Sequence, residues 1–261
     1  MTDMTLLDRA HARADANPDD DAARLGFFAR LADGEMFVLL AREAAGDAIE
    51  PRIFDLTDGP VVLAFDTAAR LAQFSAGIAP YAALPGRVLA GLLRGQGIGL
   101  GVNLGVAPSS MLLPPEALDW LATALEPVPV EVEARPVLFH APTGLPEALL
   151  TALDAKLARA GGLATGALLA GVTYEGGRRG HMLVFLDAVP GAEAALAQAA
   201  SEALVFSGIE AGEMDVAFLG SGEAAAVSMA RVALRFDLAA AATASGPRPP
   251  GMDPARPPVL R

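Results

Sequence analysis

The stretch RGQGIGLGVNLG, residues 94–105, holds five glycines within eleven positions. A dinucleotide-binding loop has the pattern Gly-x-Gly-x-x-Gly between a strand and a helix. The frames that start at the first three glycines place Leu100, Val102 and Leu104 where the last glycine belongs. A P-loop needs a lysine after its final glycine, and the only lysine of the chain is Lys156. The stretch is therefore predicted not to bind a phosphate.

Alternating glycines in this stretch are typical of a β-strand. Side chains at every second position of a strand share one face, so Gly97, Gly99 and Gly101 would leave one face bare while apolar residues line the other. Glycine inside a strand often marks a place where another backbone comes close. We expect the bare face to pack against a neighbouring element.

Around this strand (residues 98–104), apolar periodicity and turn residues predict alternating helices and strands. In the first half of the chain we expect helices at 5–16, 19–34, 65–74, 86–95 and 114–125, and strands at 35–42, 51–56 and 60–65. In the second half we expect strands at 136–141, 163–174, 180–188, 213–220 and 232–238, and helices at 145–162, 190–208 and 223–231.

The predicted fold class is α+β, with two mixed α/β-sheet domains. The β-α-β-β-α-β order of the second half, followed by one more helix and strand, is typical of split βαβ, ferredoxin-like domains. A proline- and acid-rich segment looks like a linker, and the C-terminal stretch has six prolines in its last seventeen residues, which indicates disorder. The predicted division is an N-terminal helical segment, a first domain, a linker, a second domain and a disordered tail: 1–24, 25–127, 128–135, 136–238 and 239–261.

The formal net charge is −12, of which −10 falls in residues 1–134 and −2 in residues 135–261. Binding to nucleic acid or to an anionic membrane needs a basic surface, so neither partner is expected. An acidic half fits a basic protein partner instead. The N-terminus lacks the basic and apolar regions of a signal peptide, and the longest uncharged run is rich in glycine and proline. We therefore expect a cytoplasmic protein without a membrane span.

No arrangement of residues predicts catalysis, a metal site or a cofactor. The chain has no cysteine, which excludes disulfides and thiolate chemistry. The histidines His11, His140 and His181 lack metal-ligand spacing, and Ser207 and Ser221 lack the Gly-x-Ser-x-Gly elbow. Each of these side chains is expected to be structural or at the surface.

Acidic and aromatic residues offer weaker candidates. Glu213 and Asp215 share a face of a predicted strand and could form an acid–base pair, but a solvated strand edge explains them equally well. Asp55 and Asp58 flank a turn, where aspartate is common. Trp120 is expected in the core or at an interface. The sequence thus names no catalytic, cofactor-binding or metal-binding residue.

Three stretches resemble the N-terminal domain of the SseB family of bacterial proteins: GPVVLAFDTAARLAQF (59–74), YAALPGRVLAGLL (81–93) and GIGLGVNLGVAPSSMLLPPEALDWL (97–121). The second half is similar to the C-terminal domain found in some members, so that the resemblance spans residues 25–238. The chain departs from the family pattern at Asp66-Thr67, often Thr-Ser, and at Asn103-Leu104, often Asn-Pro. The family supplies no established catalytic residues.

These observations favour a non-catalytic cytoplasmic module that binds another protein or regulates it, and that could itself form homo-oligomers. A second hypothesis is a small-ligand sensor. The resemblance points to amino acids as its ligands, because the family is named for a serine-sensitivity phenotype. A third hypothesis is an enzyme with an unrecognised carboxylate site.

Overall fold

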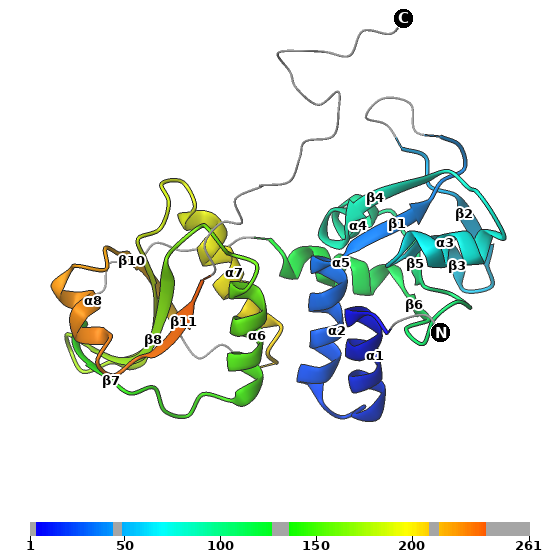
Figure 1. Ribbon diagram of the computed structural model, residues 1–261. Helices are drawn as coiled ribbons and strands as arrows, with labels where there is room; N and C mark the ends of the chain where they lie inside the picture. Colours follow the sequence, from blue (N-terminus) through cyan, green and yellow to red (C-terminus); the bar gives the residue numbers. More distant parts are fainter. Residues whose placement is uncertain (1–3, 44–48, 127–135, 209–213, 239–261) are drawn as a thin grey trace, which may run out of the picture.

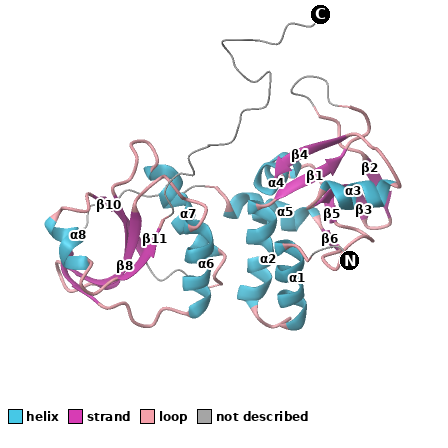
Figure 2. Ribbon diagram, in the orientation of Figure 1, coloured by secondary structure: helices cyan, strands magenta, loops and turns pink. Residues whose placement is uncertain are grey.

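The structure, a computed structural model, describes residues 4–43, 49–126, 136–208 and 214–238. Two mixed β-sheets, each with its own helices, form an N-terminal half (residues 4–126) and a C-terminal half (residues 136–238) (Figure 1). This arrangement confirms the predicted α+β class with two mixed sheets (Figure 2). The predicted linker at 128–135 and the predicted disordered tail at 239–261 lie outside the described residues.

The first sheet has the strand order β4-β1-β3-β5-β6, and β2 also pairs with β3. Only the pair β3–β5 is parallel; the other described pairs of this sheet are antiparallel. The sequence analysis missed β4 and β6, which are short strands at the two ends of this order. The strands are β1 (Glu35–Leu39), β2 (Ile53–Leu56), β3 (Gly59–Phe65), β4 (Tyr81–Pro85), β5 (Gly99–Val102) and β6 (Met111–Leu113).

The predicted helices of the N-terminal half are all present: α1 (Leu6–Ala16), α2 (Asp21–Asp33), α3 (Ala68–Ser75), α4 (Gly86–Leu93) and α5 (Pro115–Ala124). Side-chain caps begin three of them. The Thr5 hydroxyl accepts a hydrogen bond from the Asp8 amide in a capping box at the start of α1. The side chains of Asp20 and Thr67 cap α2 and α3 in the same position. Such caps satisfy amide groups that have no partner inside the helix.

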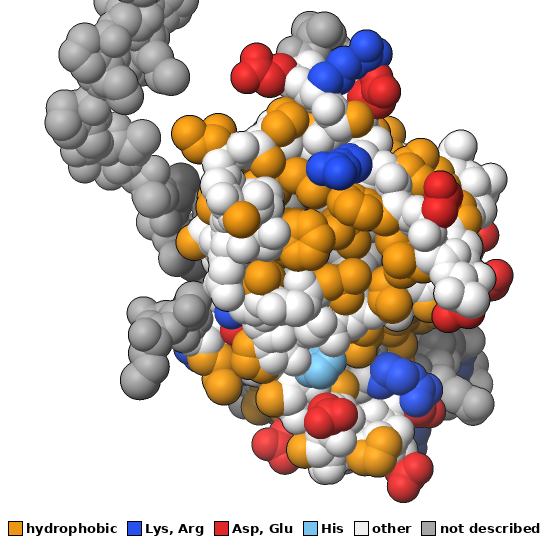
Figure 3. Space-filling model, turned by 90° about the vertical axis from the view of Figure 1, so that its right-hand side faces the viewer, with side chains coloured by type: hydrophobic (Ala, Val, Ile, Leu, Met, Phe, Trp, Pro, Cys, Tyr) orange, Lys and Arg blue, Asp and Glu red, His pale blue; other side chains and the backbone are white. Residues whose placement is uncertain are grey.

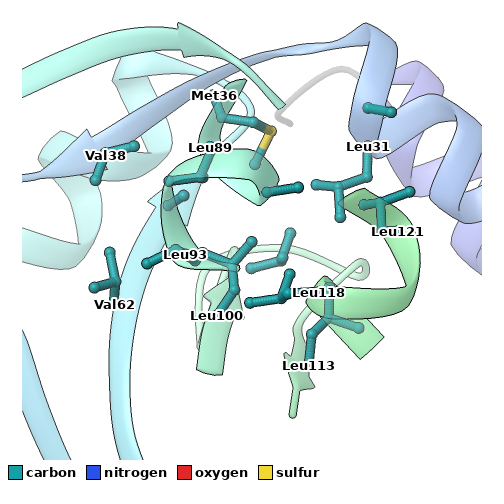
Figure 4. Close-up of a cluster of buried hydrophobic side chains, with 14 of the residues drawn as sticks. Leu31, Met36, Val38, Val62, Leu89, Leu93, Leu100, Leu113, Leu118 and Leu121 are labelled. Carbon is teal, nitrogen blue, oxygen red and sulfur yellow. The ribbon is translucent and has the colours of Figure 1, made fainter. Parts of the chain in front are cut away.

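The two faces of the first sheet are covered unequally. Helices α2, α4 and α5 pack on one face and bury a leucine-rich core (Figure 4). The other face carries only α3 and the residues after β5, over the smaller cluster of Leu39, Val61, Leu63, Phe65 and Leu71. The centre of that second face is buried, and among the described residues its exposed apolar side chains lie around this centre. The residues labelled in Figure 4 are Leu31, Met36, Val38, Val62, Leu89, Leu93, Leu100, Leu113, Leu118 and Leu121.

The predicted close packing of the glycine-rich strand, which is β5 and is called the glycine strand below, is confirmed at Gly99 and Gly101 but not at Gly97. A Cβ on Gly99 would lie 2.8 Å from the carbonyl oxygen of Leu113, and one on Gly101 would lie 2.6 Å from Leu63 Cδ2. Gly97 precedes the strand in a turn with φ of 66°, so its placement on the strand face was wrong. Alternation alone does not reveal where a strand begins, because turns also select glycine.

A buried ionic network fastens α1 to α3. The Arg70 side chain, 2% exposed, donates to both oxygens of Asp8 and, at 2.7 Å, to Asp66 Oδ1. The Ser109 hydroxyl donates to Asp8 at 2.6 Å, and the Thr5 hydroxyl donates to Asp66 at 2.6 Å. Burying charge is unfavourable unless it is paired and hydrogen-bonded, and here both carboxylates have several donors. We interpret this network as structural.

The C-terminal half holds a second sheet of order β10-β9-β8-β11, with β7 also paired to β8. Helices α6 and α7 pack on one face of this sheet and α8 on the other. Its elements occur in the predicted order: β7 (Pro136–His140), α6 (Glu147–Leu157), β8 (Gly166–Tyr174), β9 (Arg179–Leu186), α7 (Glu193–Val205), β10 (Met214–Leu219), α8 (Ala224–Met229) and β11 (Leu234–Asp237).

The strand pairing of this second sheet differs from the ferredoxin-like arrangement. A split βαβ unit places the third strand between the first two, antiparallel to both. Here β7 pairs directly with β8, while β10 lies parallel to β9 across α7. The prediction of a ferredoxin-like topology was therefore wrong, although the element order was right. Apolar periodicity identifies an element and its buried face, but it does not identify the strand beside it.

Candidate functional site

The two halves meet through four charged side chains, which we call the junction cluster: Asp33 of α2, Arg87 of α4, Lys156 of α6 and Glu202 of α7. Lys156 Nζ lies 2.9 Å from an Asp33 carboxylate oxygen and 2.6 Å from Glu202 Oε2. Arg87 donates to Asp33 at 2.7 Å and to Glu202 at 2.9 Å. Each of the two carboxylates, Asp33 and Glu202, therefore forms an ion pair with both Lys156 and Arg87. Lys156 is 7% exposed, so the only lysine of the chain lies inside the molecule.

Opposite charges keep the junction cluster ionised. Burial by itself would raise the pKa of Asp33 and of Glu202, but the neighbouring Lys156 and Arg87 hold both pKa values below the ordinary range. Burial would lower the pKa of Arg87, and the two carboxylates raise it above its usual value. The cluster is therefore neutral overall, with two positive and two negative groups.

Aromatic and hydrogen-bonding contacts extend the junction. The ring of Trp120 lies edge-to-face with Phe28 and Phe206, with centroids 5.2 and 6.2 Å away, which agrees with the prediction that Trp120 occupies the core or an interface. Gln198 Nε2 donates to the carbonyl oxygen of Leu125 at 3.0 Å. Phe206 comes from the C-terminal half but belongs to the core cluster of the N-terminal half.

A cavity that we call the junction groove opens beside this contact. It has a volume of about 310 Å³ and is lined by residues of α1, α2, α6 and α7. In Figure 1, α2 and α6 are the helices of the two halves that face each other here. A smaller cavity of about 200 Å³ is lined by the junction cluster together with residues that follow α6 and residues of α7. Both cavities are lined by Asp33 and Lys156.

The less covered face of the first sheet is a second surface of interest, which we call the apolar face. Its exposed members are Leu56, Phe74, Ile78, Tyr81 and Leu112, with exposed fractions from 37% for Phe74 to 109% for Ile78. Hydrophobic side chains gather broadly on this side of the molecule, with few charged ones among them (Figure 3). A cavity of about 240 Å³ lies between the Leu56 and Leu112 ends of this face, lined also by Gly99.

Aromatic rings pack against one another on the apolar face. Phe74 of α3 contacts Phe54 and Phe65, with ring centroids 6.4 and 5.3 Å apart. Phe37 and Tyr81 lie side by side, with centroids 5.6 Å apart. Such neighbours restrict the motion of the rings and present them as a firm surface. Exposed carboxylates at Glu35, Asp55 and Asp58 lie on the strands and turn that border these residues.

The side chains considered in the sequence analysis remain dispersed. The three histidines are half-buried; His140 and His181 each lie near a backbone carbonyl oxygen, that of Ala141 and that of Thr143 respectively. The Ser207 hydroxyl donates to the carbonyl oxygen of Leu204 at 2.7 Å. Across the ranges that the structure describes, no three His, Asp or Glu side chains gather as a metal site would require.

The carboxylate pair proposed from the sequence has only one described member. Asp215 accepts hydrogen bonds from the Tyr174 hydroxyl and from Arg178, while Glu213 lies outside the described residues. Asp55 pairs across the hairpin with Pro60, and Asp58 lies in the turn. Ser221 donates its amide to Asp187 at 2.9 Å, which lowers the pKa of that exposed carboxyl. These contacts are those of a folded surface.

Comparison with known protein families bears on the N-terminal half. Residues 7–120 match the family model of the SseB protein N-terminal domain. This part of the chain is an SseB N-terminal domain. The match includes both β3 with α3 and the glycine strand, on which the predicted resemblance depended, and it begins within α1. No curated protein and no solved structure matches the chain. Relationship of the second half to an SseB C-terminal domain stays a prediction.

The SseB N-terminal domain thus contributes the apolar face and the α1 and α2 lining of the junction groove. The sequence analysis missed the junction cluster, although a signal was present. Leu149, Leu153 and Leu157 form the buried stripe of α6, and Lys156 lies next to this stripe. A long cation beside a buried stripe indicates a partnered charge. Its partners Asp33 and Glu202 come from two other helices, α2 and α7, which the sequence could not identify. No helix within the described ranges is long and apolar enough to cross a bilayer.

Proposed function

We propose that the protein is a non-catalytic binding module that docks another protein on the apolar face of its SseB N-terminal domain. The observation behind this proposal is the exposure of several large apolar side chains on the less covered side of the first sheet (Figure 3). Large contiguous apolar surfaces on a folded protein are typical of interaction sites. Aromatic side chains are enriched at interface centres, where charged residues are scarce.

The cavity beside Leu112 gives the apolar face a place for an anchoring side chain. Its volume of about 240 Å³ exceeds that of a single aliphatic side chain. Interfaces derive most of their affinity from a few residues buried in pockets near the centre of the contact. We therefore expect a leucine-, isoleucine- or phenylalanine-like residue of the partner to insert between Leu56 and Leu112.

Charge around the apolar face favours a partner with a basic rim. Glu35 and Asp58 are exposed, and the formal charge of residues 1–134 is −10. A second copy docked face to face would bring these carboxylates together, and like-charge contacts at an interface cost several kcal/mol. The partner is thus a different protein, with an apolar centre surrounded by Lys or Arg.

A charge substitution in the apolar face tests this proposal. Leu112 is 50% exposed, so Leu112→Glu is expected to preserve the fold and to abolish stoichiometric partner capture at low salt. Val227 of α8 is 46% exposed and lies in the C-terminal half, so Val227→Glu is the matched control and should capture the partner as wild type does. The captured partner, purified, is then titrated against all three proteins by calorimetry.

Two outcomes would contradict the proposal, and a third would invalidate the control. Equal affinity of the purified partner for wild type and Leu112→Glu would remove the apolar face from the interaction. A wild-type homodimer in light scattering that Leu112→Glu converts to a monomer would assign the face to a second copy. If Val227→Glu fails to capture the partner as Leu112→Glu does, the loss would reflect an unfolded protein and not the apolar face.

A further inference from the structure

The junction groove has the character of a ligand site that is independent of the apolar face. Its volume of about 310 Å³ falls within the range of small-molecule sites, which is roughly 300–1,000 Å³. Such sites commonly lie where two structural units meet and combine an apolar lining with a few polar groups. Both features occur here, because α1 and α2 line one side of the groove and α6 lines the other.

Positive charge is concentrated on the lining of the groove. Arg9 and Arg13 lie one turn apart on α1, and Arg30 lies near the end of α2. Within the described residues, no Asp or Glu forms an ion pair with any of these three arginines. In a chain with a formal net charge of −12, three arginines around one cavity that have no acidic partner among the described residues form a local cationic site. Arginine is well suited to binding a carboxylate.

The carboxylate that lines the groove is already paired with basic side chains of the protein. Asp33 is the one carboxylate among the described residues that line the groove, and it accepts hydrogen bonds from Lys156 and Arg87. The ammonium of Lys156 is likewise held between Asp33 and Glu202. A ligand that carries an ammonium group would thus find no available carboxylate here. The junction groove favours a carboxylate without a nearby amine, which argues against a free amino acid.

The remaining lining is apolar and made of small side chains. Alanines of α1, α2 and α6 predominate, with Gly26 of α2 among them and Phe206 at one end. A Cβ added to Gly26 would meet no atom within 4 Å, so open space lies beside this position. Small side chains leave room for an alkyl chain, and contact with it removes apolar surface from water.

We propose that the junction groove binds an aliphatic monocarboxylate. The alkyl chain lies on the alanine lining between α2 and α6, and the carboxylate accepts hydrogen bonds from Arg13 and Arg30. Since both halves contribute to the lining, binding stabilises their contact and links ligand occupancy to the arrangement of the two sheets.

Calorimetric titration with sodium octanoate tests the charge requirement. Octanoate is expected to bind and to raise the melting temperature, since a ligand specific for the folded state stabilises that state. The double variant Arg13→Ala/Arg30→Ala should weaken octanoate binding by about tenfold or more, because a hydrogen bond to a charged group contributes about 1.5–3 kcal/mol. Arg235→Ala, on an exposed arginine of β11, is the matched control and should bind octanoate as wild type does.

Ligand analogues and a blocking substitution test the shape. Octanol supplies the chain without charge, octylamine reverses the charge, and leucine adds an ammonium; each should bind at least tenfold more weakly than octanoate. Gly26→Leu fills open space and should abolish octanoate binding while the protein keeps its fold, verified by circular dichroism. Leu112→Glu should bind octanoate like wild type, which separates this proposal from the docking function.

Several results would overturn the proposal. Among them are absence of octanoate binding by wild type, equal binding by the Arg13→Ala/Arg30→Ala variant, and leucine binding as tight as octanoate binding. Octanoate binding by a folded Gly26→Leu protein would place the ligand outside the junction groove.

Discussion

Asp8 illustrates how a single buried residue makes stability depend on pH. Burial would raise the pKa of this carboxyl, but hydrogen bonds from Arg70, Ser109 and the Thr5 amide lower it far below its usual value. A carboxyl whose pKa is lower in the folded state binds protons more readily when the chain is unfolded. Its contribution to stability is therefore present above the unfolded pKa of about 3.9 and is lost as the pH falls below it.

Asp8→Asn tests this contribution. The variant is expected to be less stable than wild type at pH 7, because Arg70 keeps only Asp66 as a charged partner and loss of one member of a buried pair costs about 3–5 kcal/mol. The difference should shrink as the pH falls from about 5 to 3. Urea unfolding at each pH measures both proteins. A constant difference across this range would contradict the ionised Asp8 described here.

At the scale of the element, α4 shows how one close contact sets the position of a helix. Gly86 begins α4 against the end of α2, and a Cβ at this position would overlap the carbonyl group of Leu31. Gly91 lies in the same helix, exposed, and a Cβ there would meet nothing within 4 Å. The two glycines thus provide a matched pair within eight residues of helix.

Alanine substitution should affect these two glycines in opposite directions. Gly86→Ala is expected to destabilise the protein by about 1–3 kcal/mol, because α4 must move away from α2. Gly91→Ala should stabilise it by about 0.5–1 kcal/mol, because alanine favours the helix more than glycine does. Chemical denaturation gives both values, and a Gly86→Ala protein as stable as wild type would refute the close contact.

Sequence patterns predicted elements well because each element carries its own signal. Leu149, Leu153 and Leu157 show the helical stripe of α6, and glycine alternation shows β5. Strands β4 and β6 escaped detection because β6 has only three residues and β4, a strand at the end of its sheet, has little apolar alternation. Pairing of β7 with β8 depends on the tertiary fold, since both are apolar strands that could pair elsewhere.

At the scale of the whole molecule, the junction cluster determines whether the halves unfold together. Lys156→Met would leave Asp33 and Glu202 with Arg87 as their shared base, and a buried carboxylate that loses its partner is strongly unfavourable. Wild type is expected to melt in one calorimetric transition. Lys156→Met should separate this into two transitions, or lower the melting temperature by several degrees.

An exposed ion pair provides the comparison for Lys156→Met. Arg24 of α2 pairs with Asp21 at the surface, where such pairs contribute at most about 1 kcal/mol. Arg24→Met should therefore melt like wild type. A Lys156→Met protein with the wild-type transition would show that the other contacts of the junction, such as Arg87 with Glu202 and Trp120 with Phe206, hold the halves together without Lys156.

Neither candidate site could have been assembled from the sequence. Arg13, Arg30 and Lys156 come from three helices that are separate along the chain, and no local spacing joins them. The apolar face could not be predicted either, because the sequence of an apolar strand does not show whether a helix covers it.

The network around Asp8 also constrains the order of events during synthesis. Residue 8 leaves the ribosome early, yet its hydrogen-bond partner Ser109 follows 101 residues later. At translation rates of about 5–20 residues per second, this interval lasts roughly 5–20 s. Thr5 and Arg70, the other partners of Asp8, are synthesised earlier, so during that time the network around Asp8 lacks only Ser109 and stays incomplete until the residues after β5 have been made.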